Sequence, residues 1–360
     1  MQLGFAAIFQ NPENATTDGD VYRNELRLAN LAEPLGFDSI WGVEHHFTDY
    51  TMCPDVLQFL TYMAGRTTRV KLGSMVVVLP WHDPIRVAEQ ISMLDHISGG
   101  RFILGMGRGA GRVEFEGFRV PMDESRERFV EAAQLILAGL EKGYCEYNGK
   151  YYQQPRKDIR PRPERTFKGR TYAAAVSPES VEIMAKLGIG ILVIPQKPWP
   201  MVDQELTAYR EVYQRVNKAP APAPIIAGWV FCDRDEKRAR EMAVRWIGGY
   251  WETARKHYEF GGEHFAKTKG YEFYAAMSQA QRASANQMTE MYLDLQVWGT
   301  PKMCIDRIQN TCTRMKSDAF TSVFSYAGMP YDEAERNVRL YAAEVLPALK
   351  SVEQVAAAGG

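Results

Sequence analysis

The chain has 360 residues, of which 46% are hydrophobic and 24% charged, with a formal net charge of −1. A nearly neutral chain lacks the electrostatic field that draws proteins to nucleic acid or to anionic membranes. No apolar run approaches the ~20 residues of a membrane span, and the amino-terminal residues lack the basic region of a secretion signal, so neither membrane nor nucleic acid is expected as a partner.

Cysteine usage indicates a reducing compartment. Cys304 and Cys312 are eight residues apart near a predicted helix, and we interpret them as unrelated thiols, because metal-binding cysteines follow tighter spacing rules. An odd number of scattered cysteines is typical of a reduced, cytoplasmic protein. The five cysteines are Cys53, Cys145, Cys232, Cys304 and Cys312.

Strand-like and helix-like stretches alternate through the first 107 residues. Residues 70–79 read VKLGSMVVVL, and such a nearly continuous apolar run is typical of a strand that is buried on both faces of a parallel sheet. Asp83 and Pro84 form a cap followed by a proline in the first turn, which predicts the start of a helix. The predicted strands cover residues 2–9, 39–43, 70–79 and 101–107, and the predicted helices cover 20–36, with a distorted end at Pro34, 54–65 and 83–99.

The same alternation continues after residue 107, with insertions. Residues 108–122 are predicted as a long loop, residues 145–154 as a hairpin that turns at Asn148-Gly149, and residues 155–165 as a basic, proline-rich connector. Residues 248–298 show no clear period, which is typical of a lid or of a partly mobile insertion. The remaining predicted strands cover 171–175, 191–195, 225–232 and 319–326, and the predicted helices begin at Asp123, Ser177, Val202, Asp235, Thr300 and Asp332.

Eight strands that alternate with helices predict an α/β fold. We expect a closed (β/α)8 TIM barrel in one domain over residues 1–360, with 248–298 as an insertion after the seventh strand. An open doubly wound sheet is the second candidate. Gly105, Gly107 and Ala110 match a relaxed dinucleotide-binding fingerprint, but no helix is predicted directly after them, so we do not favour that function.

Polar residues follow the predicted strands at three places. In a parallel barrel these strand ends meet at one rim, where ligands bind. The first N–H groups of a helix lack partners, so the turn 177–180 with Arg108 is a candidate phosphate clamp, although an ordinary helix cap explains the same turn. The rim residues are Glu44, His45 and His46 after the second strand, Arg108 after the fourth, and Ser177 and Ser180 after the fifth.

The adjacent histidines His45 and His46 allow three interpretations. A metal site needs further ligands, and the other four histidines lie elsewhere in the chain, so no metal is expected. A structural histidine is the second interpretation. A proton-handling histidine beside the carboxylate of Glu44 is the third, and the residues alone leave the last two open.

Taken together, these stretches resemble the luciferase-like flavin monooxygenases. The resemblance covers nearly the whole chain and is weakest over residues 248–298. It implies a TIM barrel that binds reduced FMN at its carboxyl rim. The matching stretches are GFDSIWGVEHHFTDY (36–50), LGSMVVVLPWHDPIRVAEQISMLDHISGGRFILGMGRG (72–109), FEGF (115–118), ESRERF (124–129) and GMPYDEAERNVRLYAAEVLP (328–347).

The resemblance also implies an activity. A separate flavin reductase would supply the reduced FMN, and O2 would then form a flavin C4a-peroxide that oxygenates a small organic substrate. The chain would thus be a two-component, FMN-dependent monooxygenase, and the family usually forms a dimer. Apolar residues outside a single stripe on the helices 54–65 and 83–99, such as Met63 and Met93, are compatible with a homodimer and equally with a core.

Roles for individual residues follow from the same resemblance. His45 matches the catalytic histidine, Arg108 matches the phosphate-binding arginine, and Met75–Val76 matches a non-proline cis peptide that lies against the flavin ring. Trp41, Phe47 and Trp251 are candidate walls of a dry substrate pocket. The residues implied to bind the cofactor are Glu44, Met75, Val76, Arg108, Val176, Ser177 and Ser180.

The chain departs from bacterial luciferase at three points. Gly107 stands where luciferase has a reactive cysteine, Met75 and Val76 replace two alanines, and the luciferase lid sequence is not recognisable. These departures leave flavin binding as expected but count against light emission and a long-chain aldehyde substrate. The alternatives are a deazaflavin-dependent oxidoreductase of the same superfamily, a non-catalytic flavin-binding homologue and a metal hydrolase.

Overall fold

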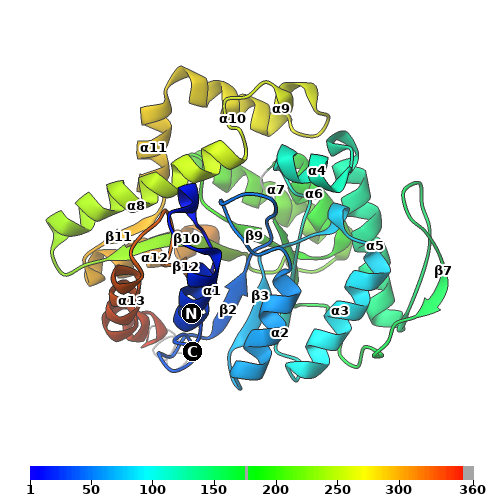
Figure 1. Cartoon of the computed structure of the whole chain (residues 1–360). Helices are drawn as coiled ribbons and strands as arrows, with labels where there is room; N and C mark the ends of the chain where they lie inside the picture. Colours follow the sequence, from blue (N-terminus) through cyan, green and yellow to red (C-terminus); the bar gives the residue numbers. More distant parts are fainter. Residues whose placement is uncertain (175–176, 352–360) are drawn as a thin grey trace.

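Eight parallel strands form a closed ring in this computed structural model, which describes residues 1–174 and 177–351. The last strand of the ring pairs with the first, with Ala319 opposite Gln2, so the barrel has no open edge. The predicted TIM barrel is confirmed (Figure 1). The ring strands are β1 (Gln2–Ala7), β2 (Ser39–Gly42), β3 (Lys71–Ser74), β5 (Phe102–Gly107), β8 (Thr171–Ala174), β9 (Gly190–Val193), β10 (Ile225–Cys232) and β12 (Ala319–Val323).

Helices surround the ring, and most begin as the sequence predicts. Asp83 caps α3 with Pro84 in its first turn, and Ser177 caps α6 with Pro178 in the same position. Gly188 ends α6 in the left-handed conformation that suits glycine. The helices around the ring are α1 (Asp18–Ala29), α2 (Val56–Arg66), α3 (Pro84–Ile97), α5 (Ser125–Lys142), α6 (Pro178–Leu187), α7 (Trp199–Asn217), α8 (Glu236–His257), α12 (Pro301–Met315) and α13 (Tyr331–Leu340).

Three predicted segments differ from the structure. Residues 70–79 are two strands, β3 and β4 (Val77–Val78), separated by the cis peptide bond Met75–Val76. The predicted loop 108–122 contains α4 (Arg112–Phe118), which begins at Gly111 without a side-chain cap, so the usual start signal is missing. The first predicted helix ends at Ala29 and gives way to turns before Pro34.

The segment 248–298 is mostly helical, which corrects the irregular insertion expected there. Helix α8 continues through Gly248 and Gly249 to His257, because Trp246, Tyr250 and Ala254 form a buried stripe at helical spacing. The rest of the segment contains α9 (His264–Lys267), α10 (Glu272–Ala283), α11 (Ala285–Asp294) and β11 (Val297–Gly299), which pairs with β10.

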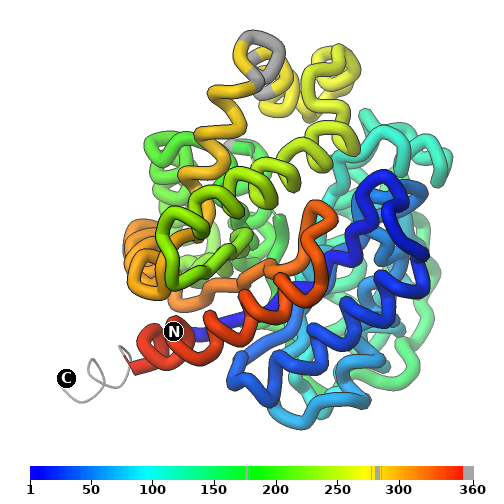
Figure 2. The backbone as a smooth tube through the Cα atoms, turned by 60° about the vertical axis from the view of Figure 1, so that its left-hand side comes forward, coloured from blue at the N-terminus to red at the C-terminus, as the bar shows by residue number. Residues whose placement is uncertain are grey.

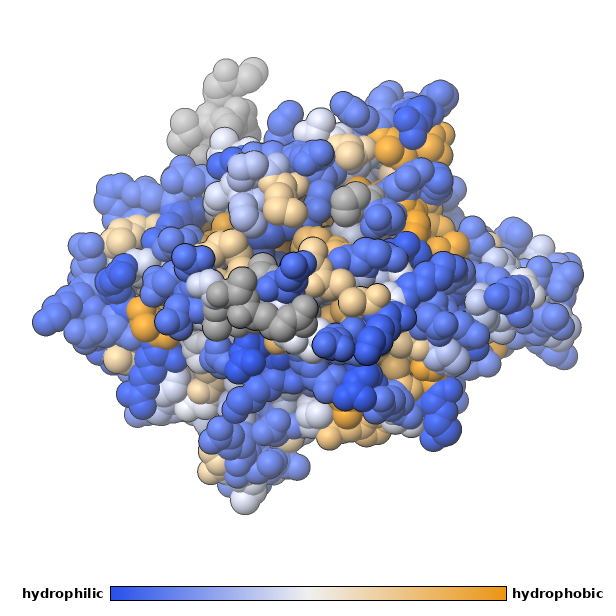
Figure 3. Space-filling view, turned by 90° about the horizontal axis from the view of Figure 1, so that it is seen from above, coloured by the Kyte–Doolittle hydropathy of each residue, from blue (hydrophilic) through white to orange (hydrophobic). Residues whose placement is uncertain are grey.

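Helices α9, α10 and α11 lie above one end of the barrel (Figure 1), and the tube in Figure 2 shows the same yellow segment standing over the ring. This end is the carboxyl end of the strands, where Val43 and Arg108 follow β2 and β5. Seen from above, the surface is largely hydrophilic, with apolar residues showing in hollows between polar ones (Figure 3). The placement suits a cover over the rim, and a lid role remains a prediction.

The interior of the barrel is filled by a tryptophan. Trp41 is 1% exposed and donates from Nε1 to Ser39 Oγ at 2.8 Å. A Cβ atom on Gly73 would lie 2.2 Å from the Trp41 ring, and one on Gly4 would lie 2.9 Å from Trp41 Nε1. Glycines on β1 and β3, the two strands that flank β2, therefore make room for the indole in the barrel interior.

Some peripheral features complete the fold. The predicted hairpin is present as β6 (Tyr144–Asn148) and β7 (Gln153–Asp158), and all five cysteines are buried and free. Met63 is fully buried in the core, whereas Met93 is 46% exposed, so only the latter lies on a surface open to a partner. Within the described ranges, we find no helix that combines the length and apolar character needed to cross a bilayer.

Candidate active site

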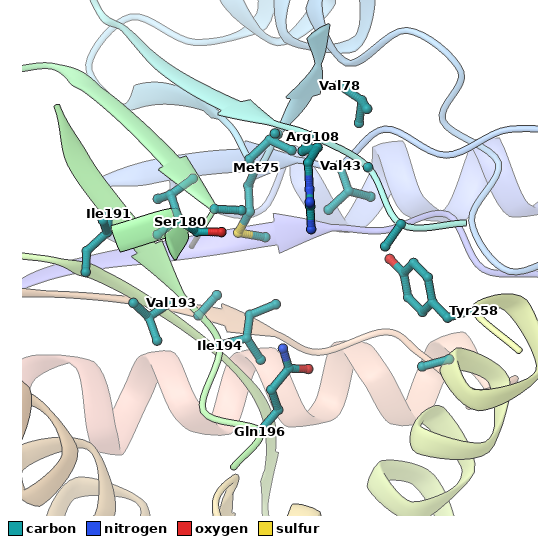
Figure 4. Close-up of a pocket in the computed structure, with 18 of the residues that line it drawn as sticks. Val43, Met75, Val78, Arg108, Ser180, Ile191, Val193, Ile194, Gln196 and Tyr258 are labelled. Atoms are coloured by element: carbon teal, nitrogen blue, oxygen red, sulfur yellow. The ribbon is translucent and has the colours of Figure 1, made fainter. Parts of the chain in front are cut away.

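A cavity of about 250 Å³ opens at the carboxyl end of the barrel. Side chains at the strand ends line it, and Figure 4 shows Arg108 projecting into its centre between Met75 and Tyr258. Because all eight ring strands contribute, groups that are distant in sequence face one space. The contributors at the strand ends include Ile8, Val43, Met75, Arg108, Ala174, Ile194, Trp229 and Val323.

His45 lies at the edge of this cavity and is held from both ring nitrogens. Its Nδ1 lies 2.9 Å from Glu114 Oε1, and its Nε2 lies 3.3 Å from the Tyr258 hydroxyl. Its side chain is only 16% exposed, because the rings of Tyr50 and His257 pack edge-on against it at 5.0 Å. The imidazole is therefore fixed in one orientation.

Glu114 is the charged centre of this group. Its side chain is fully buried, and Oε1 also accepts the backbone N–H of His46 at 3.0 Å. Burial alone would raise the pKa of Glu114, but the imidazoles of His45 and His257 beside it lower that pKa to about 2. Glu114 is thus a carboxylate near neutral pH, and it can only accept hydrogen bonds.

His257 closes the other side of the carboxylate. Its Nε2 lies 3.5 Å from Glu114 Oε2, and its Nδ1 lies 3.1 Å from Thr48 Oγ1. A Cβ on Gly111 would lie 2.4 Å from Glu114 Oε2 and 3.0 Å from His257 Nε2. The glycine at the start of α4 therefore allows the carboxylate and the second imidazole to meet.

Glu44 builds a second cluster of the same kind. Its Oε1 accepts from His82 Nε2 at 2.6 Å and from His46 Nε2 at 3.2 Å, and its Oε2 accepts the Val78 N–H at 3.0 Å. Burial raises the pKa of Glu44, yet these donors lower it overall, and Glu44 raises the pKa of His82 against the effect of burial. Glu44 lines the cavity, but its carboxylate is occupied in holding the chain after the cis bond.

Two arginines that line the cavity meet at one backbone carbonyl. Arg108 Nη1 donates to Gly270 O at 2.7 Å, and Arg126 Nη2 donates to the same oxygen at 2.9 Å. The Arg108 guanidinium also lies 4.0 Å over the Tyr271 ring. Both arginines line the cavity, and the buried Nε of Arg126 has no hydrogen-bond partner among the described residues.

The predicted clamp residues Ser177 and Ser180 line the same cavity. Ser177 Oγ accepts the Ser180 N–H at 3.3 Å, and the two hydroxyls lie 2.9 Å apart. Ser177 is therefore an ordinary helix cap and also a cavity residue, so the two interpretations are compatible. Val176 lies outside the described residues.

The wall of the cavity is mainly apolar. The predicted cis peptide bond Met75–Val76 is confirmed, and both residues line the cavity. Ile191, Val193 and Ile194 face them from the β9 side (Figure 4). Trp251 also lines the cavity, as predicted, and its ring stacks on Tyr292 at 4.7 Å.

Two predicted pocket residues lie elsewhere. Trp41 sits in the barrel interior on β2, two residues before the cavity residue Val43 that follows this strand, so it lies one layer below the cavity floor. Phe47 has a φ of 66° and is 61% exposed, and its ring packs against Phe118 of α4 at 5.1 Å. The positive φ turns its side chain outward, which the sequence pattern did not indicate.

Sequence reasoning missed four residues of this site. Glu114 and Arg126 lie in or just after the segment predicted as a loop, and His257 and Tyr258 lie in the segment predicted as irregular. Two signals in the sequence were available for these residues. Glu114 is an acid four residues before Phe118, and a stripe of apolar residues at helical spacing ends at His257. Their meaning depends on the two helices meeting over the rim, which no local pattern encodes.

His45, Glu114 and His257 are the group of described residues that could offer three metal ligands, with the ligand atoms within 4.8 Å of one another. Both ring nitrogens of His45 already have protein partners, so His45 offers no free ligand atom, although Glu114 Oε2 and His257 Nε2 have no hydrogen-bond partner among the described residues. We therefore assign no metal to them, and the absence of a metal stays a prediction.

Comparisons with known proteins agree with this geometry. The sequence profile of the family described as luciferase-like monooxygenase matches residues 1–314. The alkanal monooxygenase alpha chain of Photorhabdus luminescens is 26% identical over 366 aligned positions, which cover 98% of each chain. The match over most of the chain includes the barrel and the rim residues.

Solved structures give the same result for the fold. The monooxygenase RslO1 from Streptomyces bottropensis has a TM-score of 0.77 at 27% identity, covering 97% of this chain and 99% of that chain. The oxygenating constituent of 3,6-diketocamphane monooxygenase, encoded on the CAM plasmid of Pseudomonas putida and solved in complex with FMN, has a TM-score of 0.73. At 16% identity, covering 96% and 98% of the two chains, the latter shows a shared fold alone.

Proposed function

The chain belongs to the luciferase-like monooxygenase family of oxidoreductases, and from that premise we propose that it is an FMN-dependent, two-component monooxygenase. In this role it takes reduced FMN from a separate flavin reductase and uses O2 to oxygenate a small organic substrate. The observation that carries the proposal is one cavity that joins the imidazole of His45, the guanidinium of Arg108 and the apolar Met75–Val76 wall.

The cation pair fits a phosphate group. The two positive charges share one neutral hydrogen-bond partner, the carbonyl of Gly270, and the nearest acidic group to Arg126 is the Glu179 carboxylate at 3.9 Å. The unpartnered Nε of Arg126 adds an unused donor. Arginine suits phosphate oxygens because its donors form a rigid fork, and the hydroxyls of Ser177 and Ser180 at the start of α6 extend the clamp.

The apolar side of the cavity fits a flat ring system. Met75, Val76 and the β9 residues Ile191 and Val193 would hold the isoalloxazine of FMN, while the arginines hold its phosphate. Glu44 supports this wall indirectly, since its carboxylate fixes Val78 just beyond the cis bond. The proposal therefore keeps Glu44 as a support of the cofactor site.

Reduced FMN, when bound, supplies the electrons with which O2 is activated for transfer to a substrate. The residues of this chain do the remaining work. His45, oriented by Glu114, is the group that takes or gives a proton at the cavity. The packed rings of Trp251, Tyr292 and Tyr250 keep water from one side of the cavity, where it would divert the reaction to hydrogen peroxide.

Two partners belong to the proposal. The flavin reductase contacts the enzyme transiently, as delivery of a diffusing reduced flavin requires. A second copy of the chain is the other, and the apolar residues exposed on α2 and α3 support it: Tyr62 is 44% exposed, Met93 46% and Ile97 48%.

The deciding experiment is an anaerobic titration of the purified apo protein with reduced FMN, oxidised FMN and the deazaflavin F420, followed by flavin absorbance and fluorescence. We expect tight binding of reduced FMN and weaker binding of the other two. Preferential binding of F420 would support the deazaflavin-dependent alternative, and no binding of any flavin would refute the proposal. Arg108→Ala should weaken reduced-FMN binding by about tenfold or more, because a charged hydrogen bond to phosphate is lost.

A further inference from the structure

The structure places a tyrosine beside His45 at the cavity. Tyr258 follows the last residue of α8, and its hydroxyl lies 3.3 Å from His45 Nε2. The ring reaches into the cavity, with the hydroxyl turned toward the side on which Val43 and Arg108 lie (Figure 4). A ligand that approaches Nε2 of His45 therefore meets this phenol.

The direction of each hydrogen bond in the group follows from Glu114. A carboxylate can only accept, so the atom of His45 that faces Glu114 Oε1, its Nδ1, carries a proton. When the ring is neutral, its Nε2 then has a free lone pair. The hydroxyl next to Nε2, that of Tyr258, must be the donor in the contact between them.

The protonation state of the phenol agrees with this direction. Burial, and then the neighbouring Tyr250 and Glu114, raise the pKa of Tyr258 well above its ordinary value. Tyr258 therefore stays a neutral phenol near neutral pH and offers its proton as a donor. A phenolate would be the unfavourable state.

We propose that Tyr258 is a proton-relay residue, which donates its hydroxyl to Nε2 of His45 and links that imidazole to ligands in the cavity. The inference deepens the proposed function and rests on it for the identity of the ligand. It completes a series of hydroxyl, imidazole and carboxylate: Tyr258, His45 and Glu114. In catalytic triads the same three types of group, in the same order, activate a hydroxyl.

The relay moves one proton without leaving a phenolate. When a ligand hydroxyl in the cavity gives up its proton, that O–H bond breaks as a new O–H bond forms on Tyr258. The original Tyr258 proton passes to Nε2 of His45. The imidazolium that results is held by the Glu114 carboxylate, whose other oxygen faces His257 at 3.5 Å. No oxidant or other reactant is needed for this step.

The proposal can be tested on the apo protein by nitrogen spectroscopy of the six histidines. Protein that carries ¹⁵N-labelled imidazoles is studied by long-range ¹H–¹⁵N correlation at pH 8, and His45 is assigned from its absence in His45→Gln. We expect His45 to be protonated on Nδ1 alone, with the Nε2 resonance shifted upfield by a donated hydrogen bond. In Tyr258→Phe, which removes only the hydroxyl, the Nε2 resonance should move downfield to the range of an unbonded ring nitrogen.

Tyr274→Phe is the matched control. Tyr274 also lines the cavity, but its ring stacks on Phe265 at 5.2 Å in the covering segment, so the His45 resonances should not move. A proton on Nε2 in the wild type, protons on both nitrogens at pH 8, or an unchanged Nε2 resonance in Tyr258→Phe would each overturn the proposal.

Failure of the proposed function is recognised separately. The same wild-type and Tyr258→Phe proteins are titrated with reduced FMN, which we expect both to bind within about twofold, because the Tyr258 hydroxyl bonds to His45 and Arg108 bonds to the Gly270 carbonyl. Loss of reduced-FMN binding in the wild type would refute the flavin proposal and leave the Tyr258 hydrogen bond standing. Normal binding with no change in the His45 spectrum would refute the relay alone.

Discussion

Two buried glutamates at the barrel rim each face two imidazoles. Glu44 accepts from His46 and His82, and Glu114 accepts from His45 and faces His257. A buried carboxylate needs such partners, since burying an unpaired charge is costly. The two clusters differ in their position: the first fixes the chain after the cis bond, and the second presents an imidazole to the cavity.

Because His45 is the imidazole that faces the cavity, its removal should affect oxygen transfer but not cofactor binding. His45→Ala should leave the dissociation constant of reduced FMN within about twofold, because His45 does not contact the arginine clamp. It should lower oxygen transfer by about 100-fold, which is the lower end of the usual contribution of a general acid or base. The probe substrates are a ten-carbon aldehyde and a bicyclic ketone. The measurement is the amount of oxygenated product formed per reduced flavin consumed, and hydrogen peroxide is measured as the product of the flavin that does not oxygenate the probe.

His96→Ala serves as the control for this variant, since His96 lies on the outer helix α3 and bonds to the Arg162 carbonyl. Equal oxygen transfer in His45→Ala and the wild type would contradict the assigned role.

The ion pair of His82 with Glu44 should make the free energy of unfolding depend on pH. Its pKa is raised in the folded protein, by Glu44 against the effect of burial, so the Glu44–His82 pair stabilises the fold fully below pH 6.5 and loses this effect as the pH rises through the raised pKa. His82→Gln should therefore lower the free energy of unfolding by about 1 kcal/mol near pH 6 and by clearly less near pH 9. Urea unfolding at both pH values measures this, and a loss that is equal at pH 6 and pH 9 would exclude the mechanism.

At the scale of elements, a helix was predicted from the sequence where its start carries a local signal, and it was missed where that signal is absent. The cap of Asp83 and Pro84 predicts α3 because capping is decided within one turn. Helix α4 has no such cap and was missed, whereas the start of α8 at Asp235 was predicted but its continuation through two glycines to His257 was not. Their stability comes from packing: Arg112 of α4 pairs with Glu259 just after α8, and Glu114 meets His257.

Tyr271 anchors the covering segment, which comprises α9, α10 and α11 and the residues between them, to the rim of the barrel. Tyr271 is fully buried, donates to the Gly109 carbonyl at 2.8 Å and lies 3.0 Å from Ser125 Oγ, with Arg108 over its ring. Segments outside the barrel core open locally at a lower free-energy cost than the core strands. Tyr271 thus links the predicted lid to Arg108.

We expect Tyr271→Phe to release this anchor. Amide hydrogen exchange of residues 264–275 should become about fivefold to tenfold faster, since each lost hydrogen bond is worth about 1 kcal/mol, while the melting temperature changes little. Mass spectrometry of exchanged peptides measures both this segment and the barrel strands. Tyr213→Phe is the control. It removes a hydroxyl on α7 that bonds to the Gly188 carbonyl, and it should leave the exchange rates of residues 264–275 unchanged.

At the scale of the whole molecule, closure of the ring explains why a cavity exists at all. Strands β1 and β12 are more than 300 residues apart and pair in parallel, so residues from both ends of the chain meet at one rim. The alternation of strands and helices predicts this ring, because the topology depends on element order and not on single contacts. Side-chain packing across the ring decides which rim residues touch. Trp41 was predicted to line the cavity but lies one layer below it, so position along a strand does not by itself identify a cavity residue.

Because residues from the whole ring line the cavity, ligand binding there should change the stability of the entire fold. A ligand that binds only the folded chain stabilises it by mass action, by about 2.7 kcal/mol at 100 times its dissociation constant. Reduced FMN should therefore raise the anaerobic melting temperature by several degrees, whereas reduced riboflavin, which lacks the phosphate that we propose Arg108 and Arg126 bind, should raise it far less. In Arg108→Ala the difference between the two flavins should shrink. Equal stabilisation of the wild type by both flavins would show that the arginine pair does not hold the phosphate.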